Sequence, residues 1–135
     1  MSINDIPVLS ALRTRMQWHQ ERQRVLSENV ANSDTPNFKP RDLVEPKFDA
    51  NGASAGSMGT LAMVRTSASH IAPSSGGEQS FDENRKAGFE TRPAGNAVSL
   101  EDEMLKASAN QMDYAAATSL YGKSLHLLKT AIGKA

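Results

Sequence analysis

The segment LEDEMLKASANQMDYAAATSLYGKSLHLLKTAI, residues 100–132, decides the fold class of this chain. Apolar, small or weakly polar side chains recur in it at alternating steps of four and three residues, which is the spacing of a coiled-coil seam. At about 1.5 Å per residue the helix would be on the order of 50 Å long, so we predict a rod-shaped element rather than part of a globule. The predicted seam consists of Leu100, Met104, Ala107, Gln111, Tyr114, Thr118, Tyr121, Leu125, Leu128 and Ile132.

The start of this segment carries the signals of a helix N-terminus. Ser99 is followed three residues later by Asp102, which is typical of a capping box. Glu101 and Glu103 lie where the helix dipole favours negative charge. We therefore place a C-terminal helix within residues 98–135.

A second helix is predicted in residues 1–32, with its own seam of Leu9, Leu12, Met16, His19, Gln23, Leu26 and Val30. Polar residues interrupt both seams: His19 and Gln23 in the first, Gln111 and Thr118 in the second. Such residues either specify register and partner at a cost in stability, or simply face solvent in a loosely packed pair. The pattern leaves both interpretations open.

The middle of the chain, residues 43–97, shows no sustained period. DANGASAGSMGT (49–60) is typical of a flexible loop, while LAMVRT (61–66) and GFETR (88–92) could each form a short strand. The alternative for this segment is disorder. The predicted fold is mainly α: long N- and C-terminal helices forming a coiled-coil-like pair, with a loop-rich middle that holds a small β element.

The composition argues against several classes of function. Lysine plus arginine and aspartate plus glutamate both number 15, whereas a nucleic-acid binder would need net positive charge. The chain has no cysteine, and its three histidines are far apart and lack metal-ligand spacing. No glycine-rich loop follows a credible strand. We expect no catalytic residue, metal, cofactor, small-molecule substrate or nucleic-acid partner.

The N-terminal sequence MSINDIPVLSALRTR lacks a basic region followed by a continuous apolar run, so we predict no cleaved signal peptide. No segment approaches the roughly 20 apolar residues of a membrane span. If the protein leaves the cytoplasm, the sequence predicts that it does so by another route.

The segment NVANSDTPNFKPRD, residues 29–42, ends the first helix with many turn-forming side chains. Asn29 and Asn32 lie on one side of the last helical turn, where their amides can bond free carbonyls or a neighbouring backbone. Residues 35–38 fit a type II turn, in which Asn37 tolerates positive φ. Phe38 would then fold back toward the helix end. An ordinary helix cap explains the turn but not both amides together with the aromatic ring, so we expect a specific neighbour for residues 33–42.

This segment resembles the signature of the bacterial flagellar axial proteins, an Asn-x-x-Asn, Thr-Pro-Gly, aromatic-Lys pattern that ends their N-terminal helix. Asn37 stands where that family usually has glycine, and asparagine is the next-best residue for a left-handed position. Further positions are similar to the short proximal rod subunits of that family: Arg41-Asp42, Thr66 with His70-Ile71, residues 95–101, Glu103-Met104, Asn110, Tyr114 and residues 128–132. The matched signature positions are Asn29, Asn32, Thr35, Pro36, Phe38 and Lys39.

The resemblance implies a structural subunit that polymerises helically into the periplasmic rod of the flagellar basal body, the drive shaft around an export channel. Implied partners are the protein itself, other rod proteins, and membrane-ring and export-gate components. It also implies export by the flagellar type III system without signal cleavage. The alternative function is a soluble coiled-coil adaptor or chaperone.

Two groups of site residues follow from these patterns. The first group is the signature turn, for which the resemblance implies a role in assembly. It contains Asn29, Asn32, Thr35, Pro36, Asn37, Phe38 and Lys39. The helix-seam interface contains Leu9, Leu12, Met16, Leu26, Val30, Leu100, Met104, Tyr114, Tyr121, Leu125, Leu128 and Ile132.

Overall fold

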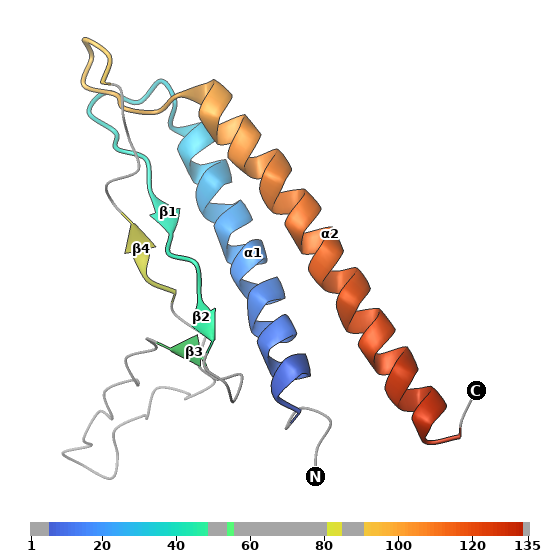
Figure 1. Ribbon diagram of the computed structural model, residues 1–135. Coiled ribbons are helices and arrows are strands. Elements are labelled where there is room, and N and C mark those ends of the chain that lie inside the picture. Colours follow the sequence, from blue (N-terminus) through green and yellow to red (C-terminus); the bar gives the residue numbers. More distant parts are fainter. Residues whose placement is uncertain (1–5, 49–53, 56–80, 85–90, 134–135) are drawn as a thin grey trace, which may run out of the picture.

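The computed structural model describes residues 6–48, 54–55, 81–84 and 91–133. Two long helices dominate it, α1 (Pro7–Ala31) and α2 (Leu100–Ala131), and they lie side by side and run antiparallel (Figure 1). The mainly helical fold with a helix pair is therefore confirmed. Within the described residues, no helix combines the length and apolar character that crossing a membrane requires.

The ends of both helices follow from local side chains. Pro7 occupies the first turn of α1, where its fixed φ suits the helix and its missing N–H is not needed. At the start of α2, the Asp102 backbone N–H donates to Ser99 Oγ at 3.5 Å, so the predicted serine cap is confirmed. Glu101 and Glu103 lie in the first turn of α2, as predicted from the helix dipole.

Four strands of two residues each make up the β structure of the described segments. β1 (Asp42–Leu43) pairs antiparallel with β4 (Glu83–Asn84), and β2 (Lys47–Phe48) pairs antiparallel with β3 (Ser54–Ala55). The predicted small β element is thus present, at other residues than expected. The predicted strand 61–66 lies outside the described residues, and of 88–92 only Thr91 and Arg92 are described, neither of them in a strand.

Helix α1 occupies the middle of the fold, with α2 on one side and β1 and β4 on the other (Figure 1). Its strand-facing side carries Trp18 and Val25, which form the core cluster with Leu43; Phe81 packs against it, partly buried. The Trp18 indole Nε1–H donates to the Val44 carbonyl at 2.8 Å. The single predicted seam therefore accounts for only part of the buried surface of α1, because a second face of this helix is buried against the strands.

The face that α2 turns toward α1 differs from the predicted seam by one residue along half of its length. The buried residues of α2 are Glu103, Asn110 and Ala117, one heptad apart. The periodicity of apolar residues favoured the neighbouring positions because two of these three carry polar side chains. In the structure the seam residues Ala107, Tyr114, Tyr121, Leu125 and Leu128 are half-buried, whereas Leu100, Met104, Gln111, Thr118 and Ile132 are exposed.

On α1 the predicted seam agrees better with burial. Leu9 and Leu26 are buried, and Leu12, Met16 and Val30 are half-buried. The polar seam residues divide between the two interpretations that the sequence left open. His19 is buried in the helix interface, whereas Gln111 and Thr118 face solvent.

Candidate assembly site: the signature turn and the polar helix interface

The signature turn has the geometry that its sequence predicts. The Phe38 backbone N–H donates to the Thr35 carbonyl at 3.3 Å, and Asn37 has a φ of 59°. A left-handed φ at the third position, after a proline, defines a type II turn. Pro36 and Lys39 are exposed, and Phe38 is half-buried.

Asn32 closes the end of α1 from within the turn. Its side-chain Nδ2 donates at 2.8 Å to the Glu28 carbonyl in the last turn of α1, which also accepts the Asn32 backbone N–H at 3.1 Å. Its Oδ1 accepts a hydrogen bond from Thr35 Oγ1 at 3.1 Å. The predicted bond between this amide and a carbonyl of the last helical turn is confirmed.

A further asparagine, Asn96, holds the turn from the opposite side. Its Nδ2 donates to the carbonyls of Asn32 at 3.0 Å and Thr35 at 2.7 Å, and its Oδ1 accepts from the Val98 N–H at 2.8 Å. Only 3% of Asn96 is exposed. Sequence reasoning assigned this residue no role, although it lies in the 95–101 segment that resembles the axial proteins.

The loop before α2 also contacts the turn through its backbone. The Asn37 N–H donates to the Ala94 carbonyl at 3.2 Å, and the Ala97 N–H donates to the Phe38 carbonyl at 3.0 Å. Gly95 lies between these contacts with a φ of +78°, and a Cβ there would overlap the Asn37 side chain. The loop and the turn therefore form one close-packed unit.

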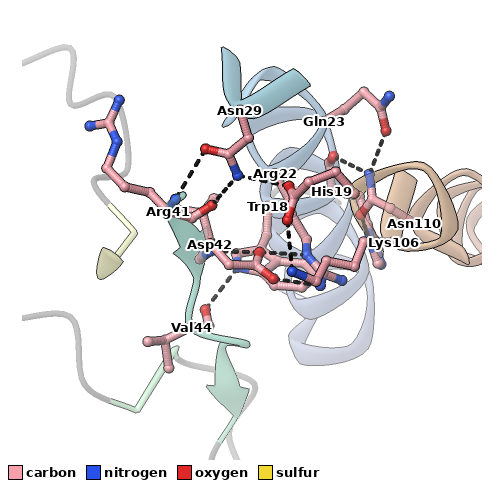
Figure 2. Close-up of polar contacts among 12 residues, drawn as sticks. Trp18, His19, Arg22, Gln23, Asn29, Arg41, Asp42, Val44, Lys106 and Asn110 are labelled. Atoms are coloured by element: carbon pink, nitrogen blue, oxygen red, sulfur yellow. Dashed lines mark hydrogen bonds and ion pairs between the residues drawn. The ribbon is translucent and has the colours of Figure 1, made fainter. Parts of the chain in front are cut away.

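Asn29 joins three segments rather than capping the helix. Its Nδ2 donates to the Arg41 carbonyl at 2.6 Å and to Glu103 Oε2 at 2.8 Å, while its Oδ1 accepts from the Arg41 N–H at 3.0 Å. Figure 2 shows this amide between α1 and the chain that enters β1. The expectation that it bonds a neighbouring backbone is confirmed; its contact with Glu103 was not predicted.

Glu103 is an acidic residue that lies in the interface between the two helices. It is 2% exposed, and its Oε1 accepts a hydrogen bond from Lys106 Nζ at 2.8 Å. Asn29 and Lys106 together provide partners for both carboxyl oxygens. Such pairing offsets the cost of removing a carboxyl group from water.

A second polar contact crosses the interface further from the turn. Asn110 Nδ2 donates to the His19 carbonyl at 2.9 Å and to Gln23 Oε1 at 3.1 Å. Since both amide hydrogens are used, the 2.7 Å contact of Asn110 Oδ1 is with a proton on His19 Nδ1. The other ring nitrogen, Nε2, is buried and has no hydrogen-bond partner in the described part of the chain.

Arg22 ties α1 to β1. Its Nε and Nη2 donate to the two carboxylate oxygens of Asp42 at 2.8 and 2.9 Å, and its guanidinium lies 5.2 Å from the Trp18 ring centroid (Figure 2). Burial alone would raise the pKa of Asp42, but the hydrogen bond and charge of Arg22 outweigh it and lower that pKa. The same hydrogen bond raises the pKa of Arg22, against the opposing effect of burial.

The side of α2 that faces away from α1 carries apolar residues that no described segment covers. We call Leu105, Met112, Leu120 and Leu127 the outer stripe; their exposed fractions are 70%, 66%, 54% and 69%. They follow one another at steps of seven or eight residues, which is about two helical turns, so they share one side of the helix.

The described residues contain no group of three metal-ligating side chains.

Comparison with known proteins gives one family. The model of a family described as "Flagella basal body rod protein" matches residues 9–39, which span most of α1 and the signature turn. The flagellar basal body rod protein FlgB of Agrobacterium fabrum is 29% identical over 127 residues, covering 93% of this chain and 91% of that protein. The proteins of the same name from Proteus mirabilis (32% identical, 71% and 72% covered) and Cereibacter sphaeroides (30%, 84% of both) are also similar.

Proposed function

This chain belongs to the flagellar basal body rod protein family, and from that premise we propose how it is built into the rod. It is a structural subunit of the basal body rod, which assembles with other flagellar axial components and serves motility. The alternative of a coiled-coil adaptor or chaperone is not favoured, since the matched relatives are named as rod proteins.

The proposal concerns which surfaces neighbouring subunits cover. The outer stripe of α2 is the observation that carries it, because four large apolar side chains lie exposed on one side of a helix whose opposite side packs on α1. Burying a leucine or methionine stabilises a contact by about 1.5–3 kcal/mol relative to exposure. The stripe is therefore a strong site for packing against another subunit, either a second copy or another rod protein.

The exposed members of the predicted seam form a separate apolar surface, beside the face of α2 that packs on α1. Leu100, Met104 and Ile132 are 41%, 62% and 76% exposed, so they are free to contact neighbours rather than α1. The signature turn lies at one end of the same helix pair and joins residues from both helices. We propose that both surfaces are covered in the assembled rod, with membrane-ring and export-gate components as further partners at its base.

We further propose that the protein is exported by the flagellar type III system and that it has no catalytic activity. The resemblance of residues 29–39 to the axial signature supports export by the flagellar type III system without signal cleavage. The buried asparagine side chains of the described residues bond backbone carbonyls and neighbouring side chains, which supports a structural rather than a catalytic role. Mass spectrometry of purified basal bodies tests the export route, because an intact N-terminal peptide is the expected result.

The test of the assembly surface places one charge inside the stripe and the same charge outside it. Leu120→Glu is compared with Gln111→Glu, which alters an exposed position of α2 that is not in the stripe. We expect both purified variants to keep the helical content of the parent, and only Leu120→Glu to disappear from basal bodies and abolish swimming. Equal incorporation of the two variants would refute the proposed surface.

A further inference from the structure

We infer that two buried polar contacts, Asn29 with Glu103 and His19 with Asn110, determine the axial register in which α1 and α2 pair. Both contacts cross the helix interface, at 2.8 and 2.7 Å, between residues that are at most 2% exposed. The inference goes beyond the rod function, since it concerns how this chain selects one pairing of its own helices.

The remaining side chains of α2 in this interface distinguish poorly between registers. Tyr114 and Tyr121 are both half-buried and lie one heptad apart, so a slip of one heptad would place one tyrosine where the other had been. Ala107 and Leu128 continue the same row. Ala117 is the one buried apolar residue of α2 in the described chain, and its methyl group is small enough to fit at several levels.

The polar contacts do not survive the same displacement. Glu103 and Asn110 are themselves one heptad apart, so a slip in one direction carries Asn110 to the level of Asn29 and leaves the His19 ring beside Ala117. A slip in the other direction carries Glu103 away from Asn29 toward His19. In both cases Asn29 and Glu103 separate, and a buried carboxyl group loses the amide that binds it.

The energetic consequence is a large preference for one register. A buried polar group left without its partner disfavours a structure by roughly 10- to 100-fold in population. Two contacts that fail together therefore suppress the slipped pairings more strongly than one. Buried polar pairs contribute less to stability than apolar packing would, and selecting a register is their best-attested use in helix pairs.

A rival explanation is that the turn alone determines the register. Asn96 holds the turn through the carbonyls of Asn32 and Thr35, and it lies only three residues before the cap of α2. A test must therefore remove the two interface contacts and leave Asn96 and the bonds between Asn29 and Arg41 intact. The variant Glu103→Leu/Asn110→Leu does so, because both changes lie on α2.

The absence of native cysteine allows disulfide formation to report the register. Gln20 Nε2 donates to the Tyr114 hydroxyl at 3.1 Å, so Met16, one turn earlier, comes level with Ala117, one turn later. Met16→Cys/Ala117→Cys therefore reports the observed register. Met16→Cys/Ser124→Cys and Leu9→Cys/Ala117→Cys report the two slips. A slip of one heptad moves a residue by about 10 Å, beyond the reach of a disulfide.

The experiment measures the yield of each disulfide in the monomer, in a glutathione buffer that allows equilibration. In the parent chain we expect the observed-register pair to exceed each slip pair at least tenfold. In Glu103→Leu/Asn110→Leu we expect slip pairs to rise at least tenfold. The matched control, Met104→Leu/Gln111→Leu, makes similar changes at the adjacent exposed positions and should leave all yields unchanged.

Unchanged yields in Glu103→Leu/Asn110→Leu would overturn the inference and assign the register to the turn. If circular dichroism shows that this variant has lost its helices, the same reporters are measured in Asn110→Ser, whose side chain is too short to reach the His19 ring. A rise of the slip pairs there supports the inference, and an unchanged distribution overturns it.

Discussion

The two ends of the helix pair are held together by different chemistry. At the turn end, Asn29, Asn96, Glu103 and Asn110 are all buried and each has hydrogen-bond partners. Beyond Ala117, no residue of α2 up to residue 133 is buried, and Leu120 and Leu127 face outward. Figure 1 shows the helix axes close together at the turn end and diverging toward the chain ends.

The difference shows how a subunit with few core residues can be ordered and still have surface to share. At the turn end, directional hydrogen bonds accompany buried apolar side chains such as Leu26 and Val98. The apolar side chains of α2 are exposed instead, so their burial can stabilise an assembly rather than the monomer.

The largest effect is expected for Asn29→Ala at the turn end. The substitution removes one partner of the buried Glu103 and leaves the backbone N–H and carbonyl of Arg41 without their side-chain partner. We expect a loss of about 3 kcal/mol in the free energy of unfolding, measured by urea denaturation. Gln111→Ala, which truncates an exposed amide of α2, should change stability by less than about 0.5 kcal/mol. Similar losses in both variants would contradict the special role of the turn end.

Gly95→Ala should cost about 2 kcal/mol at the same end. The new Cβ would occupy space taken by the Asn37 side chain, and the φ of +78° is unfavourable for alanine. Adding Asn37→Gly should restore part of the loss, because it removes the overlap but not the backbone strain. Additive effects in this double-mutant cycle would show that the two residues do not contact each other.

Much of the turn end could be predicted from the sequence because its signals are local. The proline and Asn37 predict the turn, Ser99 predicts the cap, and Asn32 bonds a carbonyl only four residues away. Asn96 and Asn110 could not be predicted in this way, since their partners lie more than 60 residues distant in the chain. An amide in a sequence carries no sign of which distant backbone it will bond.

The contact face of α2 illustrates a second limit. A prediction from periodicity assumes that apolar residues are buried. It therefore assigned Met104 to the interface and not Glu103, one position earlier. The structure buries Glu103 because Asn29 and Lys106 supply its hydrogen bonds, which a pattern of hydropathy does not register. The second buried face of α1 was missed for a related reason. Trp18 and Val25 are buried because they pack against Leu43, which is distant in the sequence.

A smaller effect, with a defined pH dependence, is expected for Asp42→Asn. The loss of the paired charge beside Arg22 should cost about 1.5 kcal/mol at pH 7. Because the pKa of Asp42 is lowered in the folded state, its contribution is complete above the ordinary pKa of about 4 and is lost as the pH falls through the lowered value.

Urea denaturation at pH 7 and at successively lower pH checks this sign, since the stabilities of Asp42→Asn and the parent should converge in acid. Glu45→Gln is the control, because Glu45 pairs with Arg15 while 63% of its side chain is exposed. Such surface pairs contribute little, so its difference from the parent should stay below about 0.5 kcal/mol at every pH. A gap for Asp42→Asn that widens in acid would contradict the assigned ion pair.

The smallest effect on the monomer is expected at the free end. Leu127→Ala removes a side chain that is 69% exposed, so we expect a change below about 0.5 kcal/mol in the free energy of unfolding. Leu26→Ala makes the same truncation at a residue with 0% exposure and should cost about 3 kcal/mol. Hydrogen exchange should follow the same division, with faster exchange for the amides of residues 118–131 than for 103–117, because packing contacts protect a helix from local opening. A large loss of stability in the Leu127→Ala monomer would mean that the outer stripe already stabilises the isolated chain. It would then not be a surface that is buried only on assembly.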